Sequence, residues 1–169
     1  IDYTTKVFSL KSANLDDLRY SNFFSDVVTS VGVGEKDYEK IQKEQSLSTG
    51  GIGLSFNVLP DSSGNKFLLS AGLHGSALKK NFSKLESLMN NTIHGFRLDE
   101  IKRLEELTQF EIAGKEKSIT QSGHILAMNG ASAQISKFGA VSEFVGGVSS
   151  IHNHKTLLDS NGQIKMEKL

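Results

Sequence analysis

Five histidines provide the side chains best suited to metal or acid–base chemistry in this 169-residue chain: His74, His94, His124, His152 and His154. A helical metal site places two histidines and a carboxylate within one turn, as in His-Glu-x-x-His or the inverted His-x-x-Glu-His, so that three side chains converge on one ion. Neither spacing occurs in the chain. We therefore assign no catalytic, metal-binding or cofactor-binding residue.

His152 and His154 are two residues apart. In an extended segment they could bind one metal ion, whereas on a helix residues at this spacing point in different directions. We interpret their segment as an ordinary exposed loop. Ser122-Gly123-His124 lacks the Gly-x-Ser-x-Gly spacing of a nucleophile elbow, and we interpret it as a helix cap with a hydrogen-bonded histidine beside it.

Composition excludes several classes of protein. The 19 acidic and 19 basic residues balance, which argues against a nucleic-acid or membrane-surface partner held by bulk charge. The absence of cysteine excludes disulfides and thiolate zinc sites. No apolar run approaches the roughly 20 residues of a membrane-spanning helix, so we expect a soluble protein. The glycine pairs at 32–34 and 51–53 lack the further residues of a dinucleotide or phosphate loop and are interpreted as turn and strand glycines.

The clearest structural signal is a hairpin. In 48–60, Ile52, Leu54, Phe56 and Val58 alternate with smaller or polar residues, which predicts a strand with one apolar face. The turn-forming residues 60–65 reverse the chain, and 66–77 alternates in the same way. The opposite face of this hairpin carries Ser55, Asn57 and His74. These three either face water or line a concave surface that another part of a larger protein covers, and water is the default.

The remaining elements are expected at these residues: a strand at 3–12, helices from Asn14 to Gly32, at 36–47, from Asn81 to Gly95 and from Asp99, a small-residue helix from Ser122, and a short turn and helix within 138–158. Inward-facing residues are expected to be Tyr38, Ile41 and Leu47 in 36–47, and Ile101, Leu104 and Leu107 in the helix from Asp99. The stripe of Gly123, Ala127, Gly130 or Ala131, and Gln134 predicts a tightly packed core helix.

This order of elements predicts a two-layer α+β fold, with an antiparallel sheet and helices packed on one of its faces. Residues 1–158 are expected to form a single domain and 159–169 a polar tail. Because the chain opens at Ile1 and ends on polar residues, we expect it to be a fragment of a larger multidomain protein.

Three pieces of sequence carry a family resemblance: Thr49-Gly50-Gly51-Ile52 opening a strand, Ser122-Gly123-His124 opening a small-residue helix, and Phe144-Val145-Gly146-Gly147-Val148-Ser149 beyond it. With their spacing, they resemble the non-catalytic middle region of the presequence protease and falcilysin branch of the pitrilysin-type zinc metallopeptidases. The likeness covers most of residues 6–158.

The resemblance implies a third-domain region of a peptidase whose two halves close around a chamber that holds an unfolded peptide. It implies a wall domain that is inactive alone, with zinc bound elsewhere in the full-length enzyme and no cofactor in this chain. Ser55, Asn57 and His74 would then be chamber residues, and the partners would be the remaining domains and the unfolded peptide substrate. The compartment would be the mitochondrial matrix or another organelle, or the cytoplasm of a bacterium.

The alternative is a stand-alone interaction or scaffold domain of the same fold, which would bind a protein partner through the hairpin edge or through the apolar patch of 144–158. The chain stops where the family would continue with further helix and a closing strand. An uncovered sheet edge or apolar face would then favour self-association of the fragment or capture of a neighbour.

Overall fold

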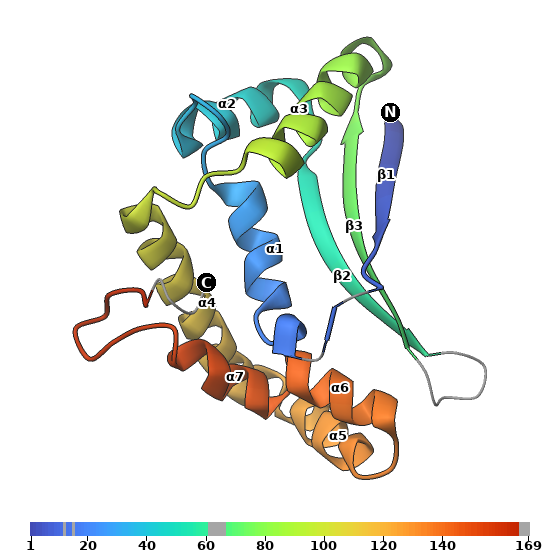
Figure 1. Ribbon diagram of the computed structural model, residues 1–169, viewed down its shortest axis with the longest axis vertical. Helices are drawn as coiled ribbons and strands as arrows, with labels where there is room; N and C mark the ends of the chain where they lie inside the picture. The colour runs from blue at the N-terminus through green and yellow to red at the C-terminus, as the bar shows by residue number, and fades with distance from the viewer. Residues whose placement is uncertain (12, 15, 61–66, 166–169) are drawn as a thin grey trace.

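A three-stranded antiparallel sheet forms one side of the molecule (Figure 1). The computed structural model describes residues 1–11, 13–14, 16–60 and 67–165. The strands are β1 (Asp2–Ser9), β2 (Ile52–Pro60) and β3 (Phe67–Ala77), and their order is β1-β3-β2. The expected pairing of β2 with β3 is confirmed, with Ile52 opposite Gly75 and Pro60 opposite Phe67. The expected turn at 60–65 lies almost wholly outside the described residues.

The apolar face of the sheet is covered by helices, as expected from the alternation in β2 and β3. Leu73 and Ala77 of β3 are buried against Leu85 and Met89 of α3 (Phe82–Gly95). Ile52 and Leu54 of β2 border the same cluster. Because strand residues two apart share a face, this arrangement leaves the alternate positions on the opposite, helix-free face.

The remaining helices complete an α+β fold, which confirms the predicted class. They are η1 (Asp16–Leu18), α1 (Ser21–Ser30), α2 (Tyr38–Ser48), η2 (Lys79–Asn81), α4 (Ile101–Gln121), α5 (Gly123–Ala133), α6 (Lys137–Gly146) and α7 (Val148–Lys155). No helix among the described residues is both long enough and apolar enough to cross a bilayer.

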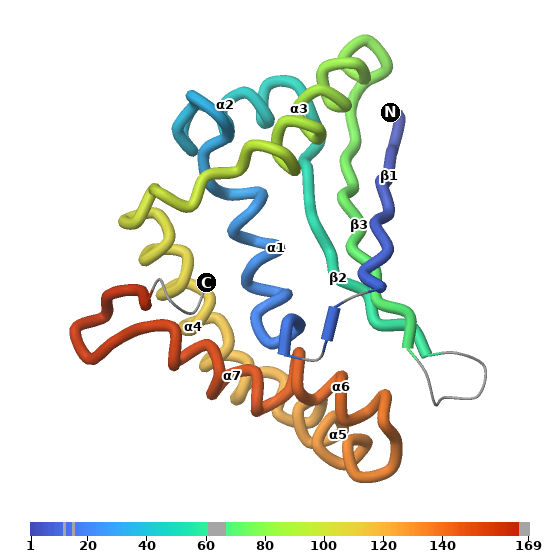
Figure 2. The backbone as a smooth tube through the Cα atoms, in the orientation of Figure 1, coloured from blue at the N-terminus to red at the C-terminus, as the bar shows by residue number. Residues whose placement is uncertain are grey.

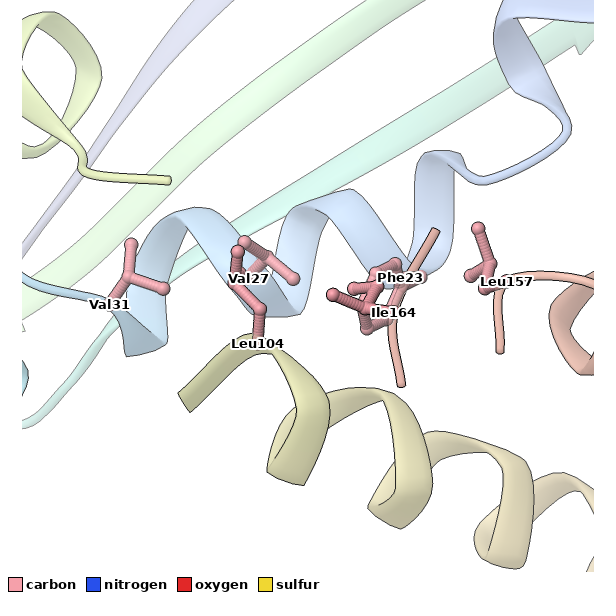
Figure 3. Close-up of a cluster of buried hydrophobic side chains, with 6 residues drawn as sticks. All are labelled: Phe23, Val27, Val31, Leu104, Leu157 and Ile164. Atoms are coloured by element: carbon pink, nitrogen blue, oxygen red, sulfur yellow. The ribbon is translucent and has the colours of Figure 1, made fainter. Parts of the chain in front are cut away.

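Helix α1 lies between the sheet and α4 (Figure 3). Phe23 and Val27 of α1 and Val31 at its C-cap follow one another at four-residue steps and share one buried cluster with Leu104 of α4. The chain beyond α7 turns back toward α4, as the tube in Figure 2 shows, and buries Ile164 in the same cluster. Residues 159–165, which the sequence places in a polar tail, therefore contribute an apolar side chain to the core.

Several expected contacts are wrong. Leu47 is 73% exposed, because the buried face of α2 runs through Ile41 and Ser48, which are seven residues apart, and Leu47 lies off it. Ile101 is 39% exposed at the first residue of α4, where Leu104 and Thr108 define the buried face. The last segment, expected as one short turn and helix, forms the two helices α6 and α7.

Helix α5 is not the tightly packed core helix that its small residues predict. It contains no buried residue, and a Cβ atom added to Gly123 or Gly130 would meet no atom within 4 Å. The glycine that allows close packing is instead Gly139 of α6, which lies against the backbone of Ser132 at the C-terminal end of α5. A stripe of small residues permits close packing, but a neighbour must be present on that side for the packing to form.

Two asparagines expected at the start of α-helices have other roles. Asn14 and Asp17 exchange side-chain to backbone hydrogen bonds of 3.1 and 2.7 Å, but they close the short 3-10 helix η1, and α1 begins only at Ser21. Asn81 precedes α3 without capping it, because its amide group donates to the carbonyl oxygen of Ser48 at 3.1 Å.

Candidate functional site

The helix-free face of the sheet brings the three sequence-predicted residues together. Cross-strand pairing places His74 beside Gly53, Gly72 beside Ser55, and Ser70 beside Asn57. Paired residues lie on the same side of the sheet, and residues two apart on one strand do so as well, so all of these side chains share one face. The structure thus gathers Ser55, Asn57 and His74 on a single surface, although they lie on two strands.

His74 has a defined position on this face although it is exposed. A Cβ atom added to Gly53 would overlap Nε2 of His74, so the imidazole ring occupies the space that any larger residue at position 53 would fill. Nδ1 of His74 lies 3.4 Å from the carbonyl oxygen of Gly72. The ring therefore rests on the glycine backbone of the neighbouring strand.

Ser55 and Asn57 border the glycine at the middle of β3. The Ser55 hydroxyl donates to the carbonyl oxygen of Gly72 at 3.4 Å, and its side chain is half-buried. Asn57 is exposed, and its Nδ2 lies 3.8 Å from the Cβ position of Gly72. These groups can donate and accept hydrogen bonds at a surface that a partner can reach.

The face carries no charged side chain on its three strands. Its members are Tyr3, Thr5, Val7 and Ser9 of β1, Leu68, Ser70, Gly72, His74 and Ser76 of β3, and Gly53, Ser55, Asn57 and Leu59 of β2. A shallow hollow lies at one end, between Tyr3, His74 and the backbone of 50–53. Hydroxyl, amide and imidazole groups therefore lie on this face beside exposed apolar side chains.

The histidines at the C-terminal end do not form a chelating pair. His152 and His154 both lie on α7, with His152 exposed and His154 1% exposed, so the expected exposed loop is wrong for this segment. Residues two apart on a helix diverge, and only one of them faces α1. In the part of the chain that the structure describes, no three His, Asp or Glu side chains gather as metal ligands would.

Sequence reasoning missed a cluster that resembles a catalytic triad. Ser150 and Glu111 lie close to the two ring nitrogens of His154, with Ser150 Oγ 3.5 Å from Nδ1 and Glu111 Oε1 3.9 Å from Nε2. Nδ1 is 2.7 Å from the carbonyl oxygen of Ser150, so it carries a proton and donates it there. A protonated Nδ1 cannot take a proton from the serine hydroxyl, and Ser150 is fully buried. The four-residue spacing of Ser150 and His154 was the available signal.

The Ser122-Gly123-His124 motif is placed only partly as expected. Ser122 occupies the N-cap position of α5, but its side chain makes no capping hydrogen bond, and His124 is exposed. The glycine pairs occupy turn and strand positions, with positive φ angles of 59° at Gly34 and 121° at Gly51. Neither motif contributes to the helix-free face beyond the backbone of 51–53.

Comparison with known proteins adds a family to this geometry. A family model described as peptidase associated, for subfamily C of metallopeptidase family sixteen, matches residues 1–157. The mitochondrial presequence protease of Drosophila melanogaster is 25% identical over 165 residues, which cover 97% of this chain and 16% of the relative. The mitochondrial presequence protease of Danio rerio is 26% identical over 147 residues, which cover 85% of this chain and 14% of the relative. Protein HypA of Clostridium perfringens is 26% identical over 151 residues, which cover 88% of this chain and 15% of the relative. The chain thus spans about one sixth of these curated relatives.

Proposed function

The chain belongs to this peptidase-associated family, and on this premise we propose that it is a non-catalytic chamber-wall domain of a zinc metalloendopeptidase that degrades short or unfolded peptides. The observation that carries the proposal is the match over residues 1–157 to a region associated with a peptidase, in a chain that lacks the His-x-x-Glu-His motif. The role in peptide degradation is an inference from the names of the relatives.

Zinc does not fit the described residues. No group of three or more potential ligands gathers among them, and the five histidines are dispersed over β3, α3, α5 and α7. The zinc ion of the proposed enzyme would therefore be held by residues outside this chain.

The helix-free sheet face supports a wall role. An unfolded peptide presents backbone donors and acceptors along its whole length, so a surface that recognises it without sequence preference needs hydrogen-bonding groups and little charge. Ser55, Asn57 and His74 supply such groups on a face where the described residues of β1, β2 and β3 place no charged side chain. We propose that this face, rather than facing bulk water, looks into the chamber.

The proposed partners are the remaining domains of the parent chain and the peptide substrate. The curated relatives are about six times as long as this chain, so most of the chamber would be built by other segments. Two of these relatives are named as mitochondrial and the third comes from a bacterium. We propose an organelle such as the mitochondrial matrix, or the bacterial cytoplasm, and the source of the gene decides between them.

A hydrolysis assay tests the inactive-domain part of the proposal. The isolated chain is incubated with an unstructured peptide and added zinc, and we expect no cleavage above the rate without protein. Robust hydrolysis that a chelator abolishes would contradict the proposal.

A binding experiment tests the wall part. The peptide is titrated into isotope-labelled protein, and we expect NMR shift changes to concentrate at Ser55, Asn57 and His74. His74→Ala should weaken these changes, whereas His94→Ala, which alters an exposed histidine on α3, should not. Shift changes confined to the helices would reject the sheet face as the peptide surface.

The second candidate function is a stand-alone interaction or scaffold domain. This second function is favoured by large exposed apolar side chains on α4 and α5, where Phe110 and Met128 are 80% and 68% exposed. The gene distinguishes the two candidates. An upstream His-x-x-Glu-His in the same reading frame supports the peptidase, and a short reading frame that ends near Leu169 supports the interaction domain.

A further inference from the structure

His154 is a histidine enclosed in the interior of the helical layer. It lies on α7 and is 1% exposed. The rings of Tyr20, at the N-cap of α1, and of Phe23 on α1 approach it edge to face, with centroid distances of 5.8 and 6.1 Å. Its Nδ1–H donates to the carbonyl oxygen of Ser150, one turn earlier on the same helix, at 2.7 Å. One nitrogen of the ring is thus satisfied within α7.

The other ring nitrogen has no hydrogen-bond partner among the described residues. Nε2 is fully buried, and the nearest carboxylate oxygen, Oε1 of Glu111 on α4, is 3.9 Å away. This distance is too long for a hydrogen bond. In the neutral ring only a lone pair is left unpaired, whereas in the protonated ring a charged N–H group would be buried without an acceptor at bonding distance.

The charged and titratable groups around His154 come from α4, from α1 and from the two residues that precede α1. Lys115 on α4 lies 3.2 Å from Glu111 and donates to the hydroxyl of Ser150 at 3.0 Å. Asp26 on α1 interacts electrostatically with Glu111 and Lys115. Just before α1, Arg19 donates to Asn153 at 3.4 Å, and the hydroxyl of Tyr20 contacts Thr156. Glu111 is therefore already paired with one cation before His154 is protonated.

Burial lowers the pKa of His154 below its ordinary value of 6.5. The hydrogen bond to the Ser150 carbonyl raises it, Lys115 lowers it and Glu111 raises it, but the loss of hydration dominates. The unfolded segment therefore binds a proton at a higher pH than the folded one. The contribution of the neutral His154 ring to the free energy of unfolding is therefore present in full above about pH 6.5. It is lost as the pH falls below 6.5 toward the pKa of His154 in the folded state.

We propose that His154 makes the docking of α7 onto α1 and α4 dependent on pH, so that acidification releases α7 and the segment that follows it. The consequence for the core is direct, because Leu157 and Ile164 come after α7 and belong to the same buried cluster as Phe23 and Leu104. Release of this segment exposes an apolar surface of α1 and α4 while the sheet and α3 keep their own core of Leu73, Leu85 and Met89. The device is a local opening, since stability differs between such units of a fold.

Hydrogen exchange on this chain measures the opening. Protection factors are determined for the amides of α7 and β3 between about pH 7.5 and pH 4.5, with correction for the intrinsic exchange rate. We expect protection in α7 to fall by up to about tenfold for each pH unit below 6.5, because one unit of pKa difference corresponds to a tenfold change in the opening equilibrium. Protection in β3 should fall less over the same range. Equal protection of α7 at all pH values would overturn the proposal.

Two variants on the same helix separate His154 from other acid effects. His154→Phe keeps an aromatic ring without a titrating group and should remove the fall in α7 protection. His152→Gln alters the exposed histidine and should leave the fall in place. If both variants lose protection in parallel with the original chain, His154 is not the responsible group.

A direct titration keeps the test decisive if His154→Phe does not fold. The ring signals of His154 are followed by NMR in the unaltered chain, and we expect the ring to remain neutral below pH 6.5 while α7 is folded. Protonation of the folded ring above pH 6.5 would overturn the proposal.

Discussion

The ring of His74 occupies the space where a side chain at Gly53 would begin. A Cβ atom at position 53 overlaps Nε2 of the ring across the β2–β3 pair. The two residues therefore form one unit on the helix-free face, in which the glycine determines where the imidazole lies. Because His74 is a proposed chamber residue, the presence of glycine at position 53 of β2 affects where an imidazole group lies on the proposed chamber surface.

We expect Gly53→Ala to displace the His74 ring at little net cost in stability. Alanine restricts the unfolded chain more than glycine does, which favours folding by about 0.5–1 kcal/mol, and moving the ring offsets this gain. In the His74→Ala background the same change should stabilise the protein by that full amount. Urea unfolding of the four proteins in the double-mutant cycle gives the coupling. Full additivity would show that the ring does not depend on Gly53.

Gly130→Ala and Gly139→Ala should have effects of opposite sign. Gly130 in α5 has open space at its Cβ position, so alanine should stabilise the helix by about 0.5–1 kcal/mol. At Gly139 in α6 a Cβ atom would overlap the carbonyl group of Ser132, and separating the helices should cost about 1–3 kcal/mol. Thermal unfolding measures both changes. Destabilisation by both would restore α5 as the tightly packed helix expected from its sequence.

Leu104→Ala should lower the free energy of unfolding by about 2–5 kcal/mol, because Leu104 is fully buried between α1 and the C-terminal segment. Leu47→Ala is the matched control. Its side chain is 73% exposed, so the change should stay within about 0.5 kcal/mol. Denaturant unfolding of both variants measures the difference. A large effect at Leu47 would mean that α2 presents the face expected from the sequence.

Asp37 should contribute a pH-dependent part of the stability of α2. Its carboxylate accepts from the Lys40 ammonium at 2.8 Å and from the Lys40 backbone N–H at 2.9 Å, and these bonds, the ammonium first, lower its pKa below the ordinary value of 3.8. Its contribution is therefore present above about pH 3.8 and is lost as the pH falls below it.

The measurement compares the unaltered chain with Asp37→Asn between about pH 6 and pH 3. Asparagine keeps a capping oxygen without the charge, so its stability deficit should shrink as the pH falls. Lys40→Met removes the ammonium and keeps the backbone bond, and it should retain only part of the pH dependence. A deficit that grows toward low pH would contradict this assignment.

The isolated chain should self-associate through its sheet. Both β1 and β2 lie at the edges of the described sheet, and Val7 on β1 is 71% exposed. Val7→Lys should raise the concentration at which association appears in sedimentation, whereas Leu47→Lys, at a similarly exposed site on α2, should not. Monomeric behaviour of the unaltered chain at high concentration would reject the prediction.

Local pattern was sufficient to predict the sheet and the faces of its strands. The alternation of Ile52, Leu54 and Phe56 specifies which side of β2 is apolar, and the helix-facing core follows from it because the backbone pleat allows no other choice. The same pattern placed Ser55, Asn57 and His74 on one surface. The inverted zinc motif is absent from the printed sequence, and no structure is needed to see that.

The tertiary structure determined which helix faces pack against another element. Helix α5 carries the stripe of small residues, yet the close contact forms at Gly139 of α6, and Leu47 lies exposed where an apolar residue was expected inside. His154 became buried because the chain folds α7 against Tyr20 and Phe23, which lie near the opposite end of the sequence. Periodicity along a chain predicts the direction in which a side chain points. Burial also depends on contacts with segments that are distant in sequence, and a local sequence pattern does not specify those contacts.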